Sequence, residues 1–461
     1  MRANHFRPLV MKFGGSSIAD LERIEHVATV VDQARAQPIL VVLSAMGRTT
    51  NHLITCLELA QQGLMNEALA SFSQLVESNR AYAREAAPNG HPLHQTVESL
   101  LEEGETLLRG IALLREASPR SRDAFVALGE RLSTHLASTV FAGRFPTEWF
   151  DARSLMRTDD RFGKAKPDCD FLMQACSHAL FPRLVPGHVI LTQGFIGAND
   201  QGLTTTLGRG GSDYSAALFG QAIDASEVQI WTDVEGVLTC DPRLVPEAVP
   251  LEELSFDEAA ELAAFGAKVL HPATLLPARR ADIPVTVRHT QFPQGRFTRI
   301  TNAGGVKRGV TALACRGPIT VLTLSSLRML DQSGFLARIF DVFARHQVSV
   351  DVVSTAEVSL SLTLEPDVAL AGLLRELNQF CEVQVAREKA LVAIVGSQLK
   401  NTRGITQRVF TALCEFDIHM ISMGANEINL SLVLDQSELP QAMRALHRAL
   451  IEVDQLQLQG G

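Results

Sequence analysis

The chain has 461 residues, which suggests about three domains, and a net charge of −9. This acidic balance argues against nucleic acid or an anionic membrane surface as the main partner, so an anionic ligand would need a local cationic pocket. The seven cysteines form no CxxC pair, which indicates neither a zinc site nor a disulfide framework. With no apolar run of transmembrane length and no secretory signal pattern at the start, we expect a cytoplasmic protein.

The first apolar run, over residues 9–13, predicts a strand that ends at Lys12 and Phe13, just before Gly14, Gly15 and Ser16. A lysine and a glycine nest at a strand end suit a polyphosphate at the carboxyl ends of parallel strands. The pattern is not a Walker A loop, because here the lysine precedes the glycines. Taken alone, it fits a solvated lysine beside a Gly-Gly turn equally well.

Strands and helical patterns then alternate along the chain. The continuous apolar run at 38–45 is typical of a buried parallel strand, and residues 52–140 show helical spacing that breaks at Pro88-Asn89-Gly90. Further strands are expected at 189–196, 203–207, 228–232 and 283–287, with a hairpin turn before the second of them. This alternation predicts an α/β domain with a mainly parallel sheet, ending near residue 305.

The most informative segment is 204–218, where Gly208, Gly210 and Gly211 surround Arg209 and Asp213 follows. Glycines let backbone N–H groups approach a ligand, and a helix that begins here would add an anion site. Arg209 can bind a carboxylate or phosphate through two parallel hydrogen bonds. Asp213 would repel an anion, so it indicates that a metal or an ammonium is also held. The alternative is a flexible surface turn.

Three other polar segments follow the same logic. Trp231–Val237 leaves a strand end, Asp241-Pro242-Arg243 follows it, and Phe265–Pro272 places Lys268 after a helical stretch. Each also has a simpler interpretation, as a polar loop or as a capped helix with a solvated lysine. Glu130, a lone acid in an apolar helix, is by itself best interpreted as a surface glutamate. No Ser/His/Asp or Cys/His constellation stands out, so glycine loops with several cations favour phosphoryl transfer.

The remainder of the chain contains an internal repeat. Shifted by 70 positions, Gly334–Leu364 aligns with Gly404–Leu434 without a gap, and the strand at 319–324 aligns with 389–394. Each copy has the pattern strand, loop, amphipathic helix, strand, turn, strand and helix. We therefore expect paired small α+β modules, with chance similarity as the alternative.

Taken together, these motifs resemble the aspartate kinase family of the amino-acid kinase superfamily, in its monofunctional lysine-sensitive type. The segments that carry the resemblance are Lys12–Ser17, Thr204–Asp213, Trp231–Gly236, Asp241–Arg243 and Phe265–Pro272, together with the repeated tail. The resemblance implies an α/β amino-acid kinase fold over 1–305, with a helical subregion at 52–140. Two ferredoxin-like ACT domains would follow at 312–388 and 389–461, and the last strand of the second could return to the first.

The reaction implied by the resemblance is transfer of the γ-phosphate of MgATP to the β-carboxylate of L-aspartate, the entry step to lysine, threonine and methionine synthesis. Lys12 would stabilise the transferring phosphoryl group and Asp213 would organise the catalytic cations, with Mg²⁺ held by the ATP phosphates and no dedicated protein site. Aspartate would be bound by Arg209, Glu130, Ser44 and Thr50. ATP would be bound by Lys12, Gly14, Gly15, Ser16, Thr232, Asp233, Arg243 and Lys268.

The resemblance also implies an allosteric amino acid, foremost lysine, and a homodimer or tetramer formed through the ACT domains. The effector site would comprise Met329, Gly334, Phe335, Leu336, Val350, Asp351, Thr355 and Glu357. Departures from the family pattern are Leu238 in place of a frequent nucleotide-contacting tyrosine, and Gln332 and Ala356 in place of serines. Two alternatives stay open: a kinase for another acidic amino acid such as glutamate, and a catalytically inactive sensor that works through its ACT pair.

Overall fold

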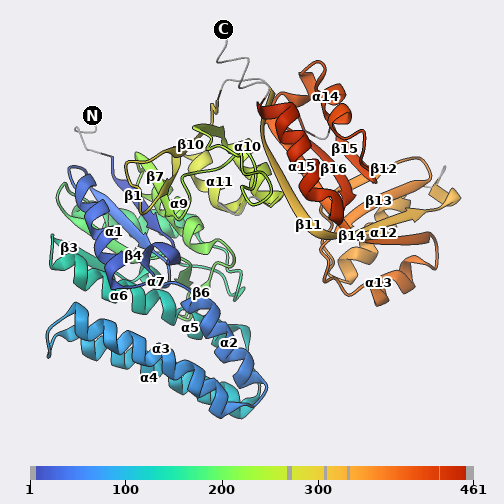
Figure 1. Ribbon diagram of the computed structural model, residues 1–461. Coiled ribbons are helices and arrows are strands. Elements are labelled where there is room, and N and C mark those ends of the chain that lie inside the picture. The colour runs from blue at the N-terminus through green and yellow to red at the C-terminus, as the bar shows by residue number, and fades with distance from the viewer. Residues whose placement is uncertain (1–6, 267–271, 306–308, 330–332, 425, 453–461) are drawn as a thin grey trace, which may run out of the picture. The chain divides into compact units, whose positions relative to one another are not determined.

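The computed structural model describes residues 7–266, 272–305, 309–329, 333–424 and 426–452 (Figure 1). It divides into two compact units. Unit 1 comprises residues 1–237, 250–256 and 269–304, and unit 2 comprises 238–249, 257–268 and 305–461. None of the helices within the described ranges combines the length and the apolar character that a bilayer crossing requires.

Unit 1 is built on an eight-stranded sheet with the order β3-β4-β2-β1-β7-β9-β10-β8, and all neighbours are parallel except β9 and β10. Its strands are β1 (Leu9–Phe13), β2 (Ile39–Leu43), β3 (Thr147–Phe150), β4 (Val189–Gln193), β7 (Glu227–Thr232), β8 (Glu253–Ser255), β9 (Val285–His289) and β10 (Phe297–Thr301). Every residue of β1, β2 and β4 is buried, which explains their continuous apolar runs. The predicted mainly parallel α/β sheet is confirmed.

Helices account for most of the rest of unit 1: α1 (Leu21–Ala34), α2 (Thr49–Gln61), α3 (Met65–Ala86), α4 (Pro92–Leu114), α5 (Pro119–Val126), α6 (Leu128–Ala142), α7 (Ala152–Leu155), α8 (Cys169–Ala179), α9 (Gly211–Ala222) and α11 (Pro272–Arg280). Helices α3 and α4 lie side by side as a long hairpin, broken at the predicted Pro88-Asn89-Gly90 turn (Figure 1).

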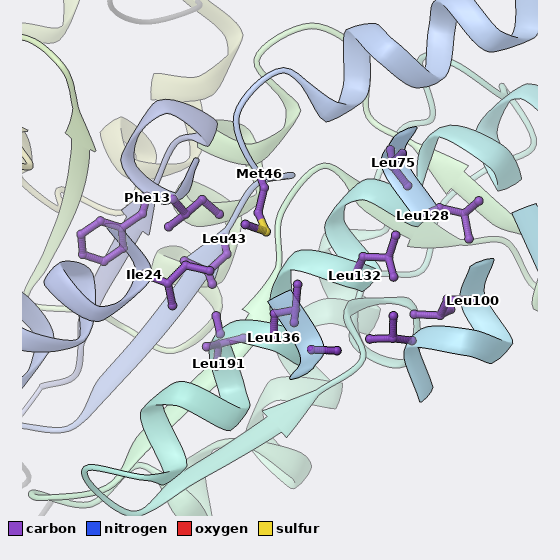
Figure 2. Close-up of a cluster of buried hydrophobic side chains, with 14 of the residues drawn as sticks. Phe13, Ile24, Leu43, Met46, Leu75, Leu100, Leu128, Leu132, Leu136 and Leu191 are labelled. Atoms are coloured by element: carbon purple, nitrogen blue, oxygen red, sulfur yellow. The ribbon is translucent and has the colours of Figure 1, made fainter. Parts of the chain in front are cut away.

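One hydrophobic core runs from the sheet to this helical hairpin. Figure 2 shows Phe13, Leu43 and Leu191 of the strands in the same cluster as Leu132 and Leu136 of α6, and the cluster continues to Leu75 and Leu100 of α3 and α4. All of these side chains are at most 5% exposed. Helix α6 therefore connects the helical subregion to the sheet. Its polar residues, among them Glu130, are thereby fixed in position beside β2.

Unit 2 contains a six-stranded antiparallel sheet with the order β12-β13-β11-β14-β16-β15. Its strands are β11 (Gly309–Ser325), β12 (Val353–Thr355), β13 (Ser359–Leu364), β14 (Glu382–Ser397), β15 (Met420–Met423) and β16 (Asn429–Asp435), and its helices are α10 (Phe256–Ala264, all but its first residue), α12 (Phe335–Arg345), α13 (Leu370–Leu377), α14 (Ile405–Ala412) and α15 (Leu439–His447). Gly334 and Gly404 occupy the same place in the two copies, each with a positive φ before a helix, at 84° and 79°. The predicted repeat of two α+β modules is confirmed.

The two modules share their central strands. Residues 320–325 of β11 pair with β13, and residues 319–325 pair with the first half of β14, inside the first module. Residues 309–316 of the same strand pair with 391–397 of β14, inside the second module. The second module therefore takes a strand from the chain that precedes the first module. The expected last strand of the second module would include residues 453–461, which lie outside the described residues.

Candidate active site

The carboxyl ends of the parallel strands of unit 1 meet at one edge of the sheet. Phe13 at the end of β1 lies beside Leu43 of β2 and Trp231 of β7. The loops that leave these strands continue the ladder through backbone hydrogen bonds: Ser44 N to Phe13 O at 3.2 Å, Gly14 N to Trp231 O at 3.2 Å, and Gly194 N to Leu43 O at 2.8 Å. Polar side chains that follow each strand are thus held in a row.

Lys12 forms the charged centre of this edge. Its side chain belongs to a strand that is otherwise apolar, the residue is only 8% exposed, and its Nζ lies 2.5 Å from Oδ1 of Asp213 in the first turn of α9. A Cβ on Gly14 would lie 3.5 Å from Nζ, so the ammonium sits over the glycine loop. The interpretation of Lys12 as a solvated lysine is therefore wrong. The structure brings Lys12, Gly14 and Asp213 together from two distant segments.

The loop after β2 is contacted by two glycines, Gly15 and Gly129, at positions where a side chain would not fit. A Cβ on Gly15 would lie 2.6 Å from Gly47 O, and a Cβ on Gly129 would lie 2.8 Å from Cβ of Ala45. Gly47 N also donates to Gly15 O at 2.9 Å. The loop that carries Ser44 is thereby held between the first strand loop and α6. Thr50 follows in the first turn of α2 and is half-buried.

Glu130 points into this loop from α6. It is 3% exposed, and its Oε1 accepts from Ala45 N at 3.2 Å, so the surface-glutamate interpretation is wrong. Its Oε2 is buried and has no hydrogen-bond partner among the described residues. Burial raises the pKa of Glu130 to about 8, because a desolvated carboxylate is unfavourable. A ligand ammonium would satisfy both the free oxygen and the charge.

Ser133 is a neighbour of Glu130 that the sequence analysis missed. It lies on the same face of α6, three residues further on, and its Oγ donates to Ser44 O at 2.7 Å. The i, i+3 spacing was the available signal. Together Glu130 and Ser133 bind both polar groups of the Ser44–Ala45 peptide bond, its N–H and its C=O.

The glycine loop between β6 (Thr204–Thr206) and α9 is ordered by its own backbone. Gly208 and Gly210 have φ values of 81° and 69°, which suit glycine, and Gly211 N donates to Gly208 O at 3.0 Å. A Cβ on Gly194 would lie 2.8 Å from Cα of Ser212, so the loop after β4 touches the start of α9. Arg209 is exposed, and its guanidinium makes no ion pair within the described ranges, which leaves it free for an anion.

A carboxylate that the sequence analysis missed, that of Asp123, supports this loop. Asp123 in the last turn of α5 accepts from Thr206 N at 2.8 Å, from Thr206 Oγ1 at 2.9 Å and from Gly163 N at 2.8 Å. It therefore fixes the hairpin of β5 (Ile196–Ala198) and β6, two residues before Gly208. Burial raises the pKa of Asp123, against the opposing effect of these three bonds. Nothing near it in the sequence indicated this role.

The remaining nucleotide candidates are distributed between the units. Thr232 Oγ1 donates to Asp233 Oδ1 at 3.1 Å at the end of β7, and Gly15 and Ser16 belong to the short helix η1 (Gly15–Ile18) after β1. Arg243 belongs to unit 2, where it is exposed and forms an ion pair with Asp241 at 2.6 Å. Lys268 lies outside the described residues.

Six of the eight candidate effector residues line one pocket of about 380 Å³ in the first repeated module. The pocket is lined by Met329, Gly334, Phe335, Leu336, Ala337, Thr355, Ala356 and Glu357, so only Val350 and Asp351 fall outside this set. Asp351 instead forms an ion pair with Arg316, which also pairs with Glu365 at 3.0 Å. Among the described residues that line the pocket, Glu357 is thus the charged one.

Comparison with known proteins agrees with this arrangement. The amino acid kinase family model matches residues 7–289, and an ACT domain model matches 392–450. The chain is 43% identical to lysine-sensitive aspartokinase 3 of Escherichia coli (strain K12) over 453 residues, which cover 96% of this chain and 99% of that protein. The chain belongs to the aspartokinase family. The family resemblance inferred from the motifs is confirmed.

Other aspartokinases support the same assignment. Chloroplastic aspartokinase 1 of Arabidopsis thaliana is 37% identical over 471 residues, covering 96% of this chain and 80% of the plant protein. Among solved structures, E. coli aspartokinase III in complex with aspartate and ADP has a TM-score of 0.84 at 42% identity, covering 96% of this chain and 99% of the other. The same enzyme with lysine and aspartate has a TM-score of 0.80 at the same identity and coverage. The predicted amino-acid kinase fold with ACT modules is confirmed.

Proposed function

We propose that this aspartokinase transfers the γ-phosphoryl group of ATP to the β-carboxylate of L-aspartate, giving ADP and 4-phospho-L-aspartate. The observation that carries the choice of acceptor is the buried Glu130, whose Oε2 has no partner among the described residues. An acceptor with an ammonium satisfies that oxygen, and an acceptor without one leaves a buried polar group unpaired. The E. coli relative whose structure contains aspartate and ADP supports the same choice.

The chemistry places few demands on the protein. An oxygen of the β-carboxylate forms a bond to the γ-phosphorus, the bond from that phosphorus to its bridging oxygen breaks, and the electron pair leaves with ADP. A carboxylate with an ordinary pKa near 3.9 is already ionised at neutral pH, so the acceptor requires no general base. Positioning and charge neutralisation then supply most of the rate.

Lys12 and Asp213 are the proposed catalytic pair. Lys12 neutralises the charge on the transferring group, and Asp213, whose Oδ1 lies 2.5 Å from Nζ, holds the ammonium in place. Mg²⁺ bound to the ATP phosphates supplies further charge neutralisation when the nucleotide is present. The carboxylate of Asp213 is a type of ligand that suits such a hard cation.

The other site residues are proposed by their positions. Arg209 would bind the α-carboxylate of aspartate and Glu130 its ammonium, with Ser44 and Thr50 lining the same pocket. The nucleotide would be bound by Gly14, Gly15, Ser16, Thr232, Asp233, Arg243 and Lys268.

We further propose that lysine is the allosteric inhibitor and that it binds in the pocket around Gly334. The backbone N–H groups at the start of α12 suit its carboxylate, and Glu357 suits an amine. Oligomers formed through the ACT modules fit the exposed apolar side chains Val353, Ile421 and Met423 on the two edge strands of the sheet. Light scattering coupled to size-exclusion chromatography would measure the oligomer, and a monomer would contradict it.

The activity is tested by measuring ADP release with MgATP and aspartate, then glutamate, then no acceptor. We expect aspartate-dependent release that falls by at least about a hundredfold in Lys12→Ala and Asp213→Ala. The matched control is Lys166→Ala, because Lys166 is exposed in the same unit. Release that depends on glutamate alone would select the other acidic amino acid, and silence with both acceptors would select the inactive sensor.

A further inference from the structure

Residues 238–249 leave the catalytic unit and pack as part of unit 2. The chain passes from unit 1 to unit 2 after Val237 and returns at Pro250. This segment carries Asp241-Pro242-Arg243, one of the proposed nucleotide-binding motifs. The position of this motif is thus determined by contacts within unit 2.

The segment is built into the core of the second module. Thr239 N donates to Val249 O at 2.9 Å, which closes the segment on itself, and Leu313 N of β11 donates to Thr239 O at 2.7 Å. Cys240 and Val245 are buried in one cluster with four side chains of α15, namely Leu439, Ala442, Met443 and Leu446. The apolar side chains of the segment therefore belong to the same core cluster as this helix.

Two polar side chains of α15 hold the other half. Arg444 Nε donates to Leu244 O at 3.0 Å, and His447 Nε2 lies 3.0 Å from Thr239 Oγ1. His447 is 1% exposed, and its Nδ1 lies 2.9 Å from Oε1 of Glu452. These bonds flank the Asp241–Arg243 turn on both sides.

The hydrogens of this network can be assigned from its donors. Val249 N donates to Thr239 Oγ1 at 3.0 Å, so the buried hydroxyl hydrogen needs an acceptor of its own. His447 Nε2 accepts it if Nδ1 carries the proton and donates to Glu452. In this tautomer each of the three polar contacts is satisfied.

We propose that His447 and Arg444 are positioning residues for ATP, which act by holding the Asp241–Arg243 turn. The proposal rests on the proposed function, because it assumes that Arg243 binds the nucleotide. Within unit 1, Val237 N donates to Thr298 Oγ1 at 2.8 Å, and three residues lie between Val237 and the candidate nucleotide residue Asp233 in the chain.

The test compares the kinetic constants of His447→Ala with those of wild type in the full-length protein. Loss of a buried hydrogen-bonded side chain should raise the KM for ATP about tenfold and leave the KM for aspartate within about twofold. His419→Ala is the matched control, because His419 also binds partners within unit 2 but does not contact this segment. Equal changes in both KM values, or none, would overturn the proposal.

Two further variants keep the outcome decisive. Arg444 is exposed, so Arg444→Ala should fold even if His447→Ala does not, and it should raise the KM for ATP in the same selective way. If His447 acts through the turn, combining His447→Ala with Arg243→Ala should weaken ATP binding no more than the stronger single variant. Additive effects would contradict the proposal, whereas Arg243→Ala with unchanged ATP binding would contradict the proposed role of Arg243 itself.

Discussion

At the scale of single residues, Glu130 is a side chain whose ionisation is strongly changed by burial. Its pKa is raised by burial from 4.5 to about 8, so the folded protein keeps a proton that the unfolded chain loses near pH 4.5. The free energy of unfolding therefore contains a contribution that is full below pH 4.5, is lost as pH rises, and is absent above about pH 8. A bound ammonium reverses this preference, because it stabilises the ionised carboxylate.

The prediction from Glu130 concerns the pH dependence of stability and binding. Glu130→Gln should reduce the loss of Tm of the ligand-free protein between about pH 5.5 and pH 8, and should raise the KM for aspartate by at least about tenfold. Calorimetric scans with and without aspartate measure the first effect. The exposed Glu77→Gln serves as control. If Tm of Glu130→Gln fell with pH as steeply as that of the wild type, the ionisation of Glu130 would not be the cause of the fall.

At the scale of elements, the packing of α6 against the loop after β2 fixes the position of Ser44. Gly129→Ala places a Cβ 2.8 Å from that of Ala45, so the loop must shift, although alanine favours the helix itself. We expect a several-fold rise in the KM for aspartate with little change in Tm. Gly110→Ala in α4 is the matched control, since its Cβ meets nothing within 4 Å and should only add stability, by about 1 kcal/mol. Unchanged kinetics in Gly129→Ala would mean that the loop accommodates the methyl group.

Asp123 gives a second prediction about elements. Asp123→Ala leaves Thr206 N, Thr206 Oγ1 and Gly163 N without their acceptor, at a cost of about 1–3 kcal/mol for each group that stays unpaired. Tm should fall, and the KM for aspartate should rise because Arg209 follows the hairpin directly. Asp159→Ala is the comparison, because Asp159 is half-buried in the neighbouring loop and forms an ion pair with Arg161. A drop in Tm without any change in the KM for aspartate would show that the hairpin does not influence aspartate binding, and would contradict this prediction.

How far the sequence predicts these elements depends on whether the signal is local. Strands β1, β2 and β4 were predictable because burial on both faces leaves a continuous apolar run, and the glycines at 208–211 mark a loop that only glycine allows. The burial of Glu130 and the Lys12–Asp213 pair were not predictable from the residues, since each depends on segments far apart in the chain. The sharing of β11 between the modules is likewise a matter of register, which periodicity does not encode.

At the scale of the whole molecule, the proposed inhibition by lysine is a coupling between two sites, so it must be reciprocal at equilibrium. If lysine weakens aspartate binding by some factor, aspartate must weaken lysine binding by the same factor. Titration calorimetry on the full-length protein measures both affinities, that for lysine with and without aspartate and that for aspartate with and without lysine. Glu357→Ala should abolish lysine binding and leave activity without lysine unchanged, and the exposed Glu415→Ala should behave as wild type. Retained inhibition in Glu357→Ala would place the effector in another pocket.

The most direct test of the central claim is to trap the product. An acyl phosphate on aspartate reacts with hydroxylamine, so the enzyme with MgATP, L-aspartate and hydroxylamine should form the β-hydroxamate and ADP in equal amounts. Lys12→Ala should form neither. ADP without hydroxamate, or a wild-type yield of hydroxamate from Lys12→Ala, would contradict phosphoryl transfer to aspartate at this sheet edge.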